Sequence, residues 1–297
     1  MDSRSLRSKA SEETLISLLH LDPSPIETPP ALEDSVSSLK STSSAPGLSG
    51  SGHGTIFYLT RIQKFSSYLV PIFTSIHLAN TSIIPLVARS VVASETYLLQ
   101  SREIYQTSLT EPLLVALPIV AHVASGVALR FARRSQNLHR YGMSRTTAYN
   151  SSGSAARIWP PLSYISASGY AFAVFLAAHV GVNRVLPLQV EGDSSNIGLA
   201  FVAHGFARLP TLSWLAYTGL LLVGCGHMVW GAAKWLGYAP TATRQQRRMI
   251  WWGLHGATFG AFVVWAAGGL GIVAREGLTT GWVGKLYDDL FDKIPLC

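Results

Sequence analysis

Five histidines lie in long apolar stretches of the chain, one in each stretch. They are His77, His122, His179, His227 and His255, out of nine histidines in 297 residues. An ionisable ring in such a stretch is expensive, and residues of this kind are usually functional. A neutral imidazole has a free ring nitrogen that can ligate a metal. Metal ligation is therefore one chemistry to consider, and hydrogen bonding between packed helices is the other.

The sequence around four of these histidines repeats. The order Tyr, Phe, His recurs with identical spacing in Tyr68-Phe73-His77 and Tyr170-Phe175-His179. The other two histidines are each followed four residues later by glycine, Gly126 and Gly231. We interpret this as a duplicated two-helix unit with a fifth helix added. Two such crossings give repeats related by an axis along the membrane normal, so His77 is predicted to face His179 and His122 to face His227.

Opposed imidazoles are what haem b held edge-on between helices requires. Each pair would ligate haem iron, and small residues such as Gly126, Gly231, Ala178 and Gly181 would make room for the flat ring. The alternative is that the four histidines pack against each other and bind nothing. His255 lies outside the repeat and is interpreted as structural or interfacial. His204 is expected in a loop beside Arg208, with no special role.

The stretches that carry these histidines have the length and composition of membrane helices. The chain is 48% apolar and only 13% charged, whereas soluble domains carry about 25% charged residues. About 20 apolar residues suffice to cross a bilayer as a helix. Five segments qualify: 65–88, 112–132, 162–186, 211–236 and 250–273. Without period-2 alternation, they predict an all-α polytopic bundle of five transmembrane helices.

Several functional classes are disfavoured. The bundle has no nucleophile-and-base arrangement and no carboxylates, so we predict that the chain is not an enzyme. No charged residue lies at midspan to couple an ion, which disfavours a transporter. Nucleic-acid binding is not expected either, because the net charge of +7 comes from basic residues that flank the spans. The lipid bilayer is the expected surrounding.

The loop charges predict the orientation. No Asp or Glu occurs in 112–190 or 194–275, and the loops after the second and fourth spans are basic. The positive-inside bias then places both loops and the N-terminus in the cytosol, with the C-terminus on the other side. The predicted domains are a disordered tail over 1–60, the five-helix domain over 61–275 and a short C-terminal tail over 276–297.

The tail contains a candidate docking peptide at 14–26. Apolar residues that include Leu18 and Leu19 precede Pro23-Ser24-Pro25, and this Pro-x-Pro sequence favours an extended chain. Apolar anchors beside an extended segment are typical of peptides that dock on a partner. A short helix lying on the membrane, or an unstructured linker, explains the same residues.

Two resemblances extend these interpretations. SASGYAFAVFLAAHV and HMVWGAAKWLG resemble the di-haem cytochrome b subunits of fumarate reductases and succinate dehydrogenases. That resemblance implies bis-histidine haem b at His77, His122, His179 and His227, and a transmembrane cytochrome with an electron-transfer role. The family has an additional helix between its two histidine pairs, which this chain lacks.

The tail, the five histidine-bearing segments and the basic loops together resemble the fungal mitochondrial outer-membrane adaptors called Mcp, over about residues 12–275. This resemblance implies an adaptor in mitochondrial lipid homeostasis, with a cytosolic N-terminus and a C-terminus in the intermembrane space. It also implies a partner, the bridge-like lipid-transfer protein of the vacuolar-protein-sorting class, recruited at membrane contact sites. The implied partner-binding residues are Leu21, Pro23, Ser24, Pro25 and Ile26, with Leu18 and Leu19 upstream.

Overall fold

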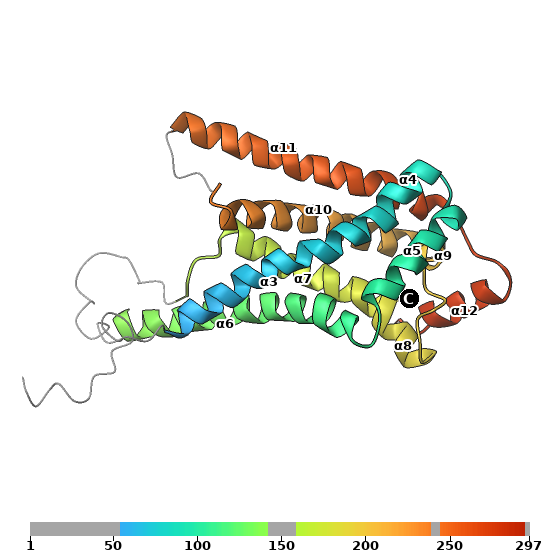
Figure 1. The fold of residues 1–297 in the computed structure, drawn as a ribbon, viewed down its shortest axis with the longest axis horizontal. Coiled ribbons are helices and arrows are strands. Elements are labelled where there is room, and N and C mark those ends of the chain that lie inside the picture. Colours follow the sequence, from blue (N-terminus) through green and yellow to red (C-terminus); the bar gives the residue numbers. More distant parts are fainter. Residues whose placement is uncertain (1–53, 142–158, 239–243, 295–297) are drawn as a thin grey trace, which may run out of the picture. The chain divides into compact units, whose positions relative to one another are not determined.

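Long helices dominate the structure. The computed structural model describes residues 54–141, 159–238 and 244–294, and every regular element in these ranges is helical (Figure 1). Five helical segments are long and apolar enough to cross a membrane: Thr55–Ala88, Glu111–His139, Tyr164–Val190, Pro210–Trp235 and Arg247–Arg275. The predicted all-α fold with five spans is confirmed. The first span begins ten residues before the predicted window, because helical hydrogen bonding continues through polar residues such as Arg61 and Lys64.

The first and third spans share an interruption of the same kind. The first span consists of α3 (Thr55–Leu78), a π-helical turn (Ala79–Ile83) and α4 (Ile84–Ala88). The third span consists of α7 (Tyr164–Val180), a π-helical turn (Gly181–Val185) and α8 (Leu186–Val190). Each π turn begins two residues after a histidine, and a proline follows it, Pro85 or Pro187. Proline has no N–H for the carbonyl four residues earlier, so the wider turn continues the helix without that bond. The duplication therefore extends beyond the histidines.

The remaining spans pack these two into a bundle. They are α6 (Leu117–Tyr141), which follows a π turn (Glu111–Ala116), α10 (Pro210–Trp235) and α11 (Arg244–Gly269). α3 lies along α6, α7 lies along α10, and α11 lies along α10 (Figure 1). α11 also contacts the first span, where the Ser82 hydroxyl donates to the carbonyls of Val264 and Trp265 at 2.7 and 2.8 Å. Gly268 permits this approach, since a Cβ there would lie 1.9 Å from the Ser82 carbonyl oxygen.

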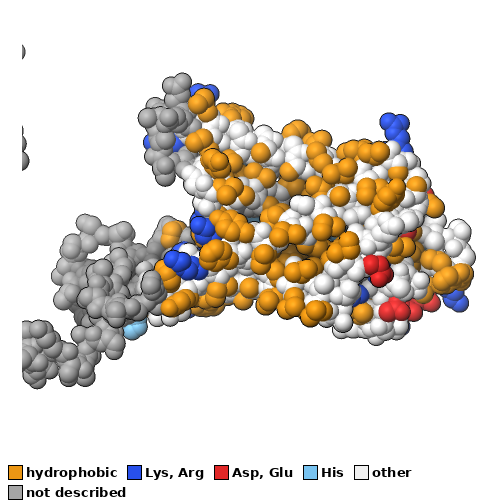
Figure 2. Space-filling view, viewed as in Figure 1, with side chains coloured by type: hydrophobic (Ala, Val, Ile, Leu, Met, Phe, Trp, Pro, Cys, Tyr) orange, Lys and Arg blue, Asp and Glu red, His pale blue; other side chains and the backbone are white. Residues whose placement is uncertain are grey.

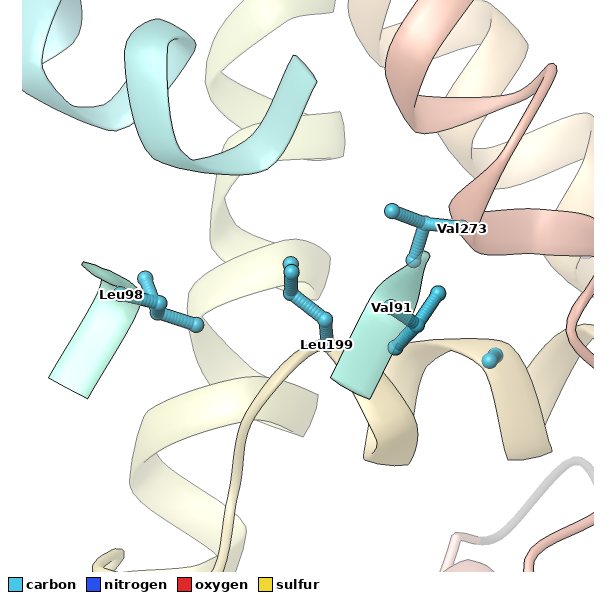
Figure 3. Packing of buried hydrophobic residues seen from close by; sticks show 5 residues of the cluster. Val91, Leu98, Leu199 and Val273 are labelled. Atoms are coloured by element: carbon cyan, nitrogen blue, oxygen red, sulfur yellow. The ribbon is translucent and has the colours of Figure 1, made fainter. Parts of the chain in front are cut away.

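Three short helices cover one end of the bundle, and we call them the cap. They are α5 (Val91–Tyr105), α9 (Leu199–Arg208) and α12 (Gly281–Phe291). Val91, Leu98, Leu199 and Val273 form a buried cluster there (Figure 3). α12 lies in the region expected to be a short C-terminal tail. Its apolar residues recur at helical spacing, as in Val283, Tyr287 and Leu290, and this signal could have identified it from the sequence.

Charge separates the two ends of the bundle. Apolar side chains cover the spans, and acidic side chains gather toward the cap (Figure 2). The other end, which we call the basic end, has the described cations Arg133, Arg134, Lys234, Arg247 and Arg248 next to the two basic loops. The three spans α7, α10 and α11 contain no carboxylate, as the sequence requires. The bundle thus has an apolar belt with a positive end and a mixed-charge end.

Candidate cofactor site

The four repeat-related histidines meet in the two predicted pairs. The ring centres of His77 on α3 and His179 on α7 are 6.0 Å apart, with 74° between the ring planes. The ring centres of His122 on α6 and His227 on α10 are 6.1 Å apart, again at 74°. Each pair therefore joins one helix of the α3–α6 hairpin to one helix of the α7–α10 hairpin. The sequence duplication is visible as two equivalent contacts.

These separations fit a metal held between two rings. A metal–imidazole bond is about 2 Å long, and roughly 1 Å separates each ligating nitrogen from its ring centre, so two rings in line stand about 6 Å apart. All hydrogen bonds that the four rings form within the described residues use Nδ1. Nε2 is the nitrogen left for a metal. The residues present thus fit bis-histidine ligation.

His122 and His227 are oriented by equivalent backbone groups. Nδ1 of His122 lies 3.1 Å from the Gln63 carbonyl oxygen, and Nδ1 of His227 lies 3.1 Å from that of Ile165. A serine hydroxyl, Ser66 in one case and Ser168 in the other, lies 3.4 Å from the same nitrogen. A carbonyl oxygen only accepts, so Nδ1 carries the proton and Nε2 keeps its lone pair. This tautomer is the one that ligating histidines adopt.

The other pair has different neighbours. His77 is stacked on Phe73, with 5.4 Å between ring centres, and its Nδ1 is buried without a hydrogen-bond partner among the described residues. Nδ1 of His179 lies 3.4 Å from the Asn183 amide nitrogen, which also contacts the Tyr217 hydroxyl at 3.1 Å. Side chains rather than backbone carbonyls therefore surround this pair.

The glycines near the histidines were expected to make room for a haem ring, but their neighbours in the structure are side chains of the same hairpin or no described atom. Gly169 lets the ring of His227 approach α7, since a Cβ at 169 would lie 2.7 Å from His227 Cε1. Gly126 makes room for the Gln63 side chain, whose Nε2 would be 2.9 Å from a Cβ. A Cβ at Gly181 or Gly231 would have no described atom within 4 Å. Close packing within each hairpin, rather than space between the hairpins, explains Gly126 and Gly169.

Other predicted residues lie outside this site. The peptide at 14–26, with Leu18, Leu19, Leu21, Pro23, Ser24, Pro25 and Ile26, falls outside the described residues. His255 packs between Trp230 and Trp251, with ring centres 5.3 and 4.1 Å away. Within the described ranges, no group of three or more His, Cys, Asp or Glu side chains could hold a metal ion. The two histidine pairs are therefore the candidate site.

The position of His204 differs from the one expected from the sequence. It lies in helix α9 rather than in a loop, and its side chain is buried in the cap. Its Nδ1 accepts from the Thr279 N–H at 3.1 Å, so Nε2 carries the proton and donates to Asp288 at 3.0 Å. This hydrogen bond and the nearby Arg208 lower the pKa of Asp288. The ring joins α9 to α12 and has a structural role that spacing alone did not reveal.

The class of protein that this fold defines is a polytopic helical membrane protein with two histidine pairs between its first four spans. Residues 174–278 match a family described as the transmembrane domain of MDM10-complementing protein 1. No curated protein and no solved structure matches the chain. The family match supports a membrane protein similar to that family and linked to mitochondria. Nothing in these comparisons supports the resemblance to cytochrome b subunits.

Proposed function

We propose that this chain is an adaptor in the mitochondrial outer membrane that recruits a bridge-like lipid-transfer protein to membrane contact sites. In this role it supports mitochondrial lipid homeostasis. The observation that carries the proposal is the similarity of residues 174–278 to the transmembrane domain of MDM10-complementing protein 1. The matched region runs from α7 through α11, and it includes His179 and His227. An adaptor of this kind needs an anchor and an exposed peptide but no catalytic group.

The charge distribution supports an orientation for this adaptor. The cations of the basic end face the cytosol by the positive-inside bias, and the N-terminus lies on the same side. With a cytosolic N-terminus and five spans, the proposed adaptor has its C-terminus in the intermembrane space. Protease added to intact mitochondria should remove an N-terminal tag and spare a C-terminal one. The reverse result would contradict the proposal, because the tail would face away from its partner.

The docking peptide provides the direct test. Pro23→Ala combined with Pro25→Ala should abolish recruitment of the lipid-transfer protein, because the extended Pro-x-Pro conformation lowers the entropic cost of binding. Leu18→Ala with Leu19→Ala should weaken recruitment less. Both variants should remain in the outer membrane, since the substitutions lie outside the five spans. Normal recruitment by the proline variant would assign docking to another segment.

A second candidate function is a haem b-binding transmembrane cytochrome, and the two imidazole pairs at 6.0 and 6.1 Å favour it. His77 and His179 would hold one haem, and His122 and His227 the other. Bound haem would supply one-electron transfer across the bundle. The chain itself orients the rings through Nδ1 and surrounds them with apolar side chains. The two functions are compatible, because the adaptor uses the tail and the cytochrome uses the bundle.

The difference spectrum of the purified full chain, reduced minus oxidised, tests the second function. Bis-histidine haem b should give a Soret band and sharp bands at longer wavelength. If no reconstitution with haem yields a Soret band, the four histidines are packing residues. The adaptor proposal would survive that outcome, because it depends on the tail and on the similarity of the membrane domain.

A further inference from the structure

A second ring-lined site lies at the basic end of the bundle, apart from the histidine pairs. A cavity of about 330 Å³ opens between the start of α7, the end of α10 and the start of α11. Its lining residues are Ser163, Tyr164, Ile165, Trp230, Trp251 and His255. We call it the Trp230 cavity. Figure 1 shows that these three helix ends lie at the same end of the bundle.

Aromatic rings form most of the wall. The ring centre of Trp230 is 5.9 Å from that of Tyr164 and 5.3 Å from that of His255, and Trp251 lies 4.1 Å from His255. Trp and Tyr are enriched where membrane spans meet the head-group region. An aromatic belt alone explains rings that point into the bilayer. It does not explain rings from three helices that line one cavity.

One polar group in this wall lacks a partner. Trp230 Nε1 is buried and has no hydrogen-bond partner among the described residues. An indole nitrogen is a donor only, and leaving a buried donor unpaired is unfavourable. His255 belongs to the same lining, and its ring packs against those of Trp230 and Trp251. A ligand with an acceptor oxygen would satisfy the indole N–H.

Cations lie one helical turn outside the rings. Lys234 follows Trp230 by four residues on α10, and Arg247 and Arg248 precede Trp251 by four and three residues on α11. Residues at these spacings lie on the same helix face. Both arginines are exposed, and no Asp or Glu occurs anywhere in 194–275 to neutralise them. Sequence spacing therefore puts three cations on the basic-end side of a cavity whose lining is mostly aromatic and apolar.

We propose that the Trp230 cavity binds an anionic phospholipid of the surrounding bilayer. Its phosphate lies against Lys234, Arg247 and Arg248, its ester region lies on the aromatic wall, and an ester carbonyl accepts from Trp230 Nε1. From the basic end inward, the cations and then the aromatic wall follow the order of groups in a leaflet lipid, whose charged head group is outermost, whose esters come next and whose acyl chains are deepest. Basic pockets between membrane helices bind anionic head groups by this combination of charge and apolar area. The site is separate from the tail, and it shares one residue with the surroundings of the histidine pairs, Ile165, whose carbonyl oxygen lies 3.1 Å from His227 Nδ1.

The test compares the retention of two lipids by the full chain. Native mass spectrometry of the purified protein, with equimolar phosphatidylglycerol and phosphatidylcholine of the same acyl chains, should show preferential retention of phosphatidylglycerol. Arg247→Gln with Arg248→Gln should reduce that occupancy roughly tenfold or more, since each cation near anionic lipid contributes on the order of 1 kcal/mol. The matched control is Arg61→Gln with Lys64→Gln, which removes two charges from α3 residues that do not line the cavity.

A second variant tests the hydrogen bond. Trp230→Phe keeps an aromatic ring and removes the N–H, so it should lower phosphatidylglycerol retention about fivefold. Trp252→Phe, on the same helix as Trp251 but outside the cavity lining, should change nothing. Equal retention of the two phospholipids by the unaltered chain would overturn the proposal. So would identical retention by the two charge variants, or preferential retention of an added sterol that the arginine substitutions leave unchanged.

Discussion

The two histidine pairs have nearly the same geometry but different supports. Their ring centres are 6.0 and 6.1 Å apart, and both make angles of 74°. Backbone carbonyls orient His122 and His227 at 3.1 Å. At the other pair, His77 Nδ1 has no partner among the described residues, and His179 has Asn183. The two repeats thus share the ring separation, whereas the groups that orient the rings differ.

Because different groups orient them, the two histidine pairs should tolerate substitutions of neighbouring residues differently. A backbone carbonyl is present whatever the side chain, so the orientation of His122 and His227 does not depend on the identities of Gln63 and Ile165. The Asn183–Tyr217 contact depends on two side chains from two spans. A π turn also begins two residues after His77 and two after His179, but none follows His122 or His227 within their helices. The pair beside the π turns is therefore the more adjustable one.

If each histidine pair binds haem as proposed, the largest expected effect is the loss of one haem signal. His227→Leu removes a ligand from the His122 pair, because leucine cannot coordinate iron, and it should leave the His77–His179 signal intact. Quantitative haem analysis and the reduced-minus-oxidised spectrum measure the signal that is lost and the signal that remains. His255→Leu, the control, should change neither signal. Loss of both haems in His227→Leu would mean that the pairs do not act as separate sites.

A smaller effect is expected from crowding one pair without removing a ligand. Gly169→Ala places a Cβ 2.7 Å from His227 Cε1, so the ring must shift. We expect roughly tenfold weaker haem binding at this pair alone, the magnitude seen when the surroundings of a ligand change. Gly231→Ala, on α10, meets no described atom within 4 Å and is the matched control. Equal effects of the two substitutions would show that helix propensity, and not the contact with His227, is responsible.

If each pair binds haem as proposed, the two haems should differ in reduction potential. The hydrogen bonds from Nδ1 to the Gln63 and Ile165 carbonyls make those imidazoles better electron donors, which favours ferric iron. The His122–His227 haem should therefore have the lower midpoint potential. A redox titration followed optically resolves two midpoints in the unaltered chain, and His227→Leu assigns them. A single midpoint, or the opposite order, would contradict the role given to the carbonyls.

The smallest effect concerns the side chains beside His179. Asn183→Ala removes the contact with Tyr217, and hydrogen bonds between membrane helices contribute about 0.6 kcal/mol on average. The free energy of unfolding should fall by about that amount. Any change in the haem spectrum should be confined to the signal of the His77–His179 pair. Tyr217→Phe should have a similar effect, and the double variant should lose little more than either single one. Additive losses would mean that the two side chains act separately.

The sequence predicted the spans and the pairing but not the cap. Hydropathy identifies helices that contact lipid over their whole length, which is why all five spans were found. The repeat then determined which histidines lie opposite each other, because equivalent residues meet across the symmetry axis. α5 and α9 are short, and packing against other helices determines them, whereas α12 carries a helical spacing of apolar residues that the sequence analysis did not use. The burial of His204 depends on Thr279 and Asp288, far from it in the chain. Whether the four paired histidines ligate haem stays a prediction.

The cap also determines where the bundle can widen. Its helices come from the connections after the first and third spans and from the segment after the fifth, so the cap ties both histidine hairpins and α11 together at one end. Arg102, on α5, donates to the carbonyls of Ser194 and Ile197 just before α9, each at 2.6 Å. The described residues place no comparable layer of helices across the basic end. The two hairpins are therefore held together at the cap end. Any separation between them is greatest at the basic end, where the basic loops begin.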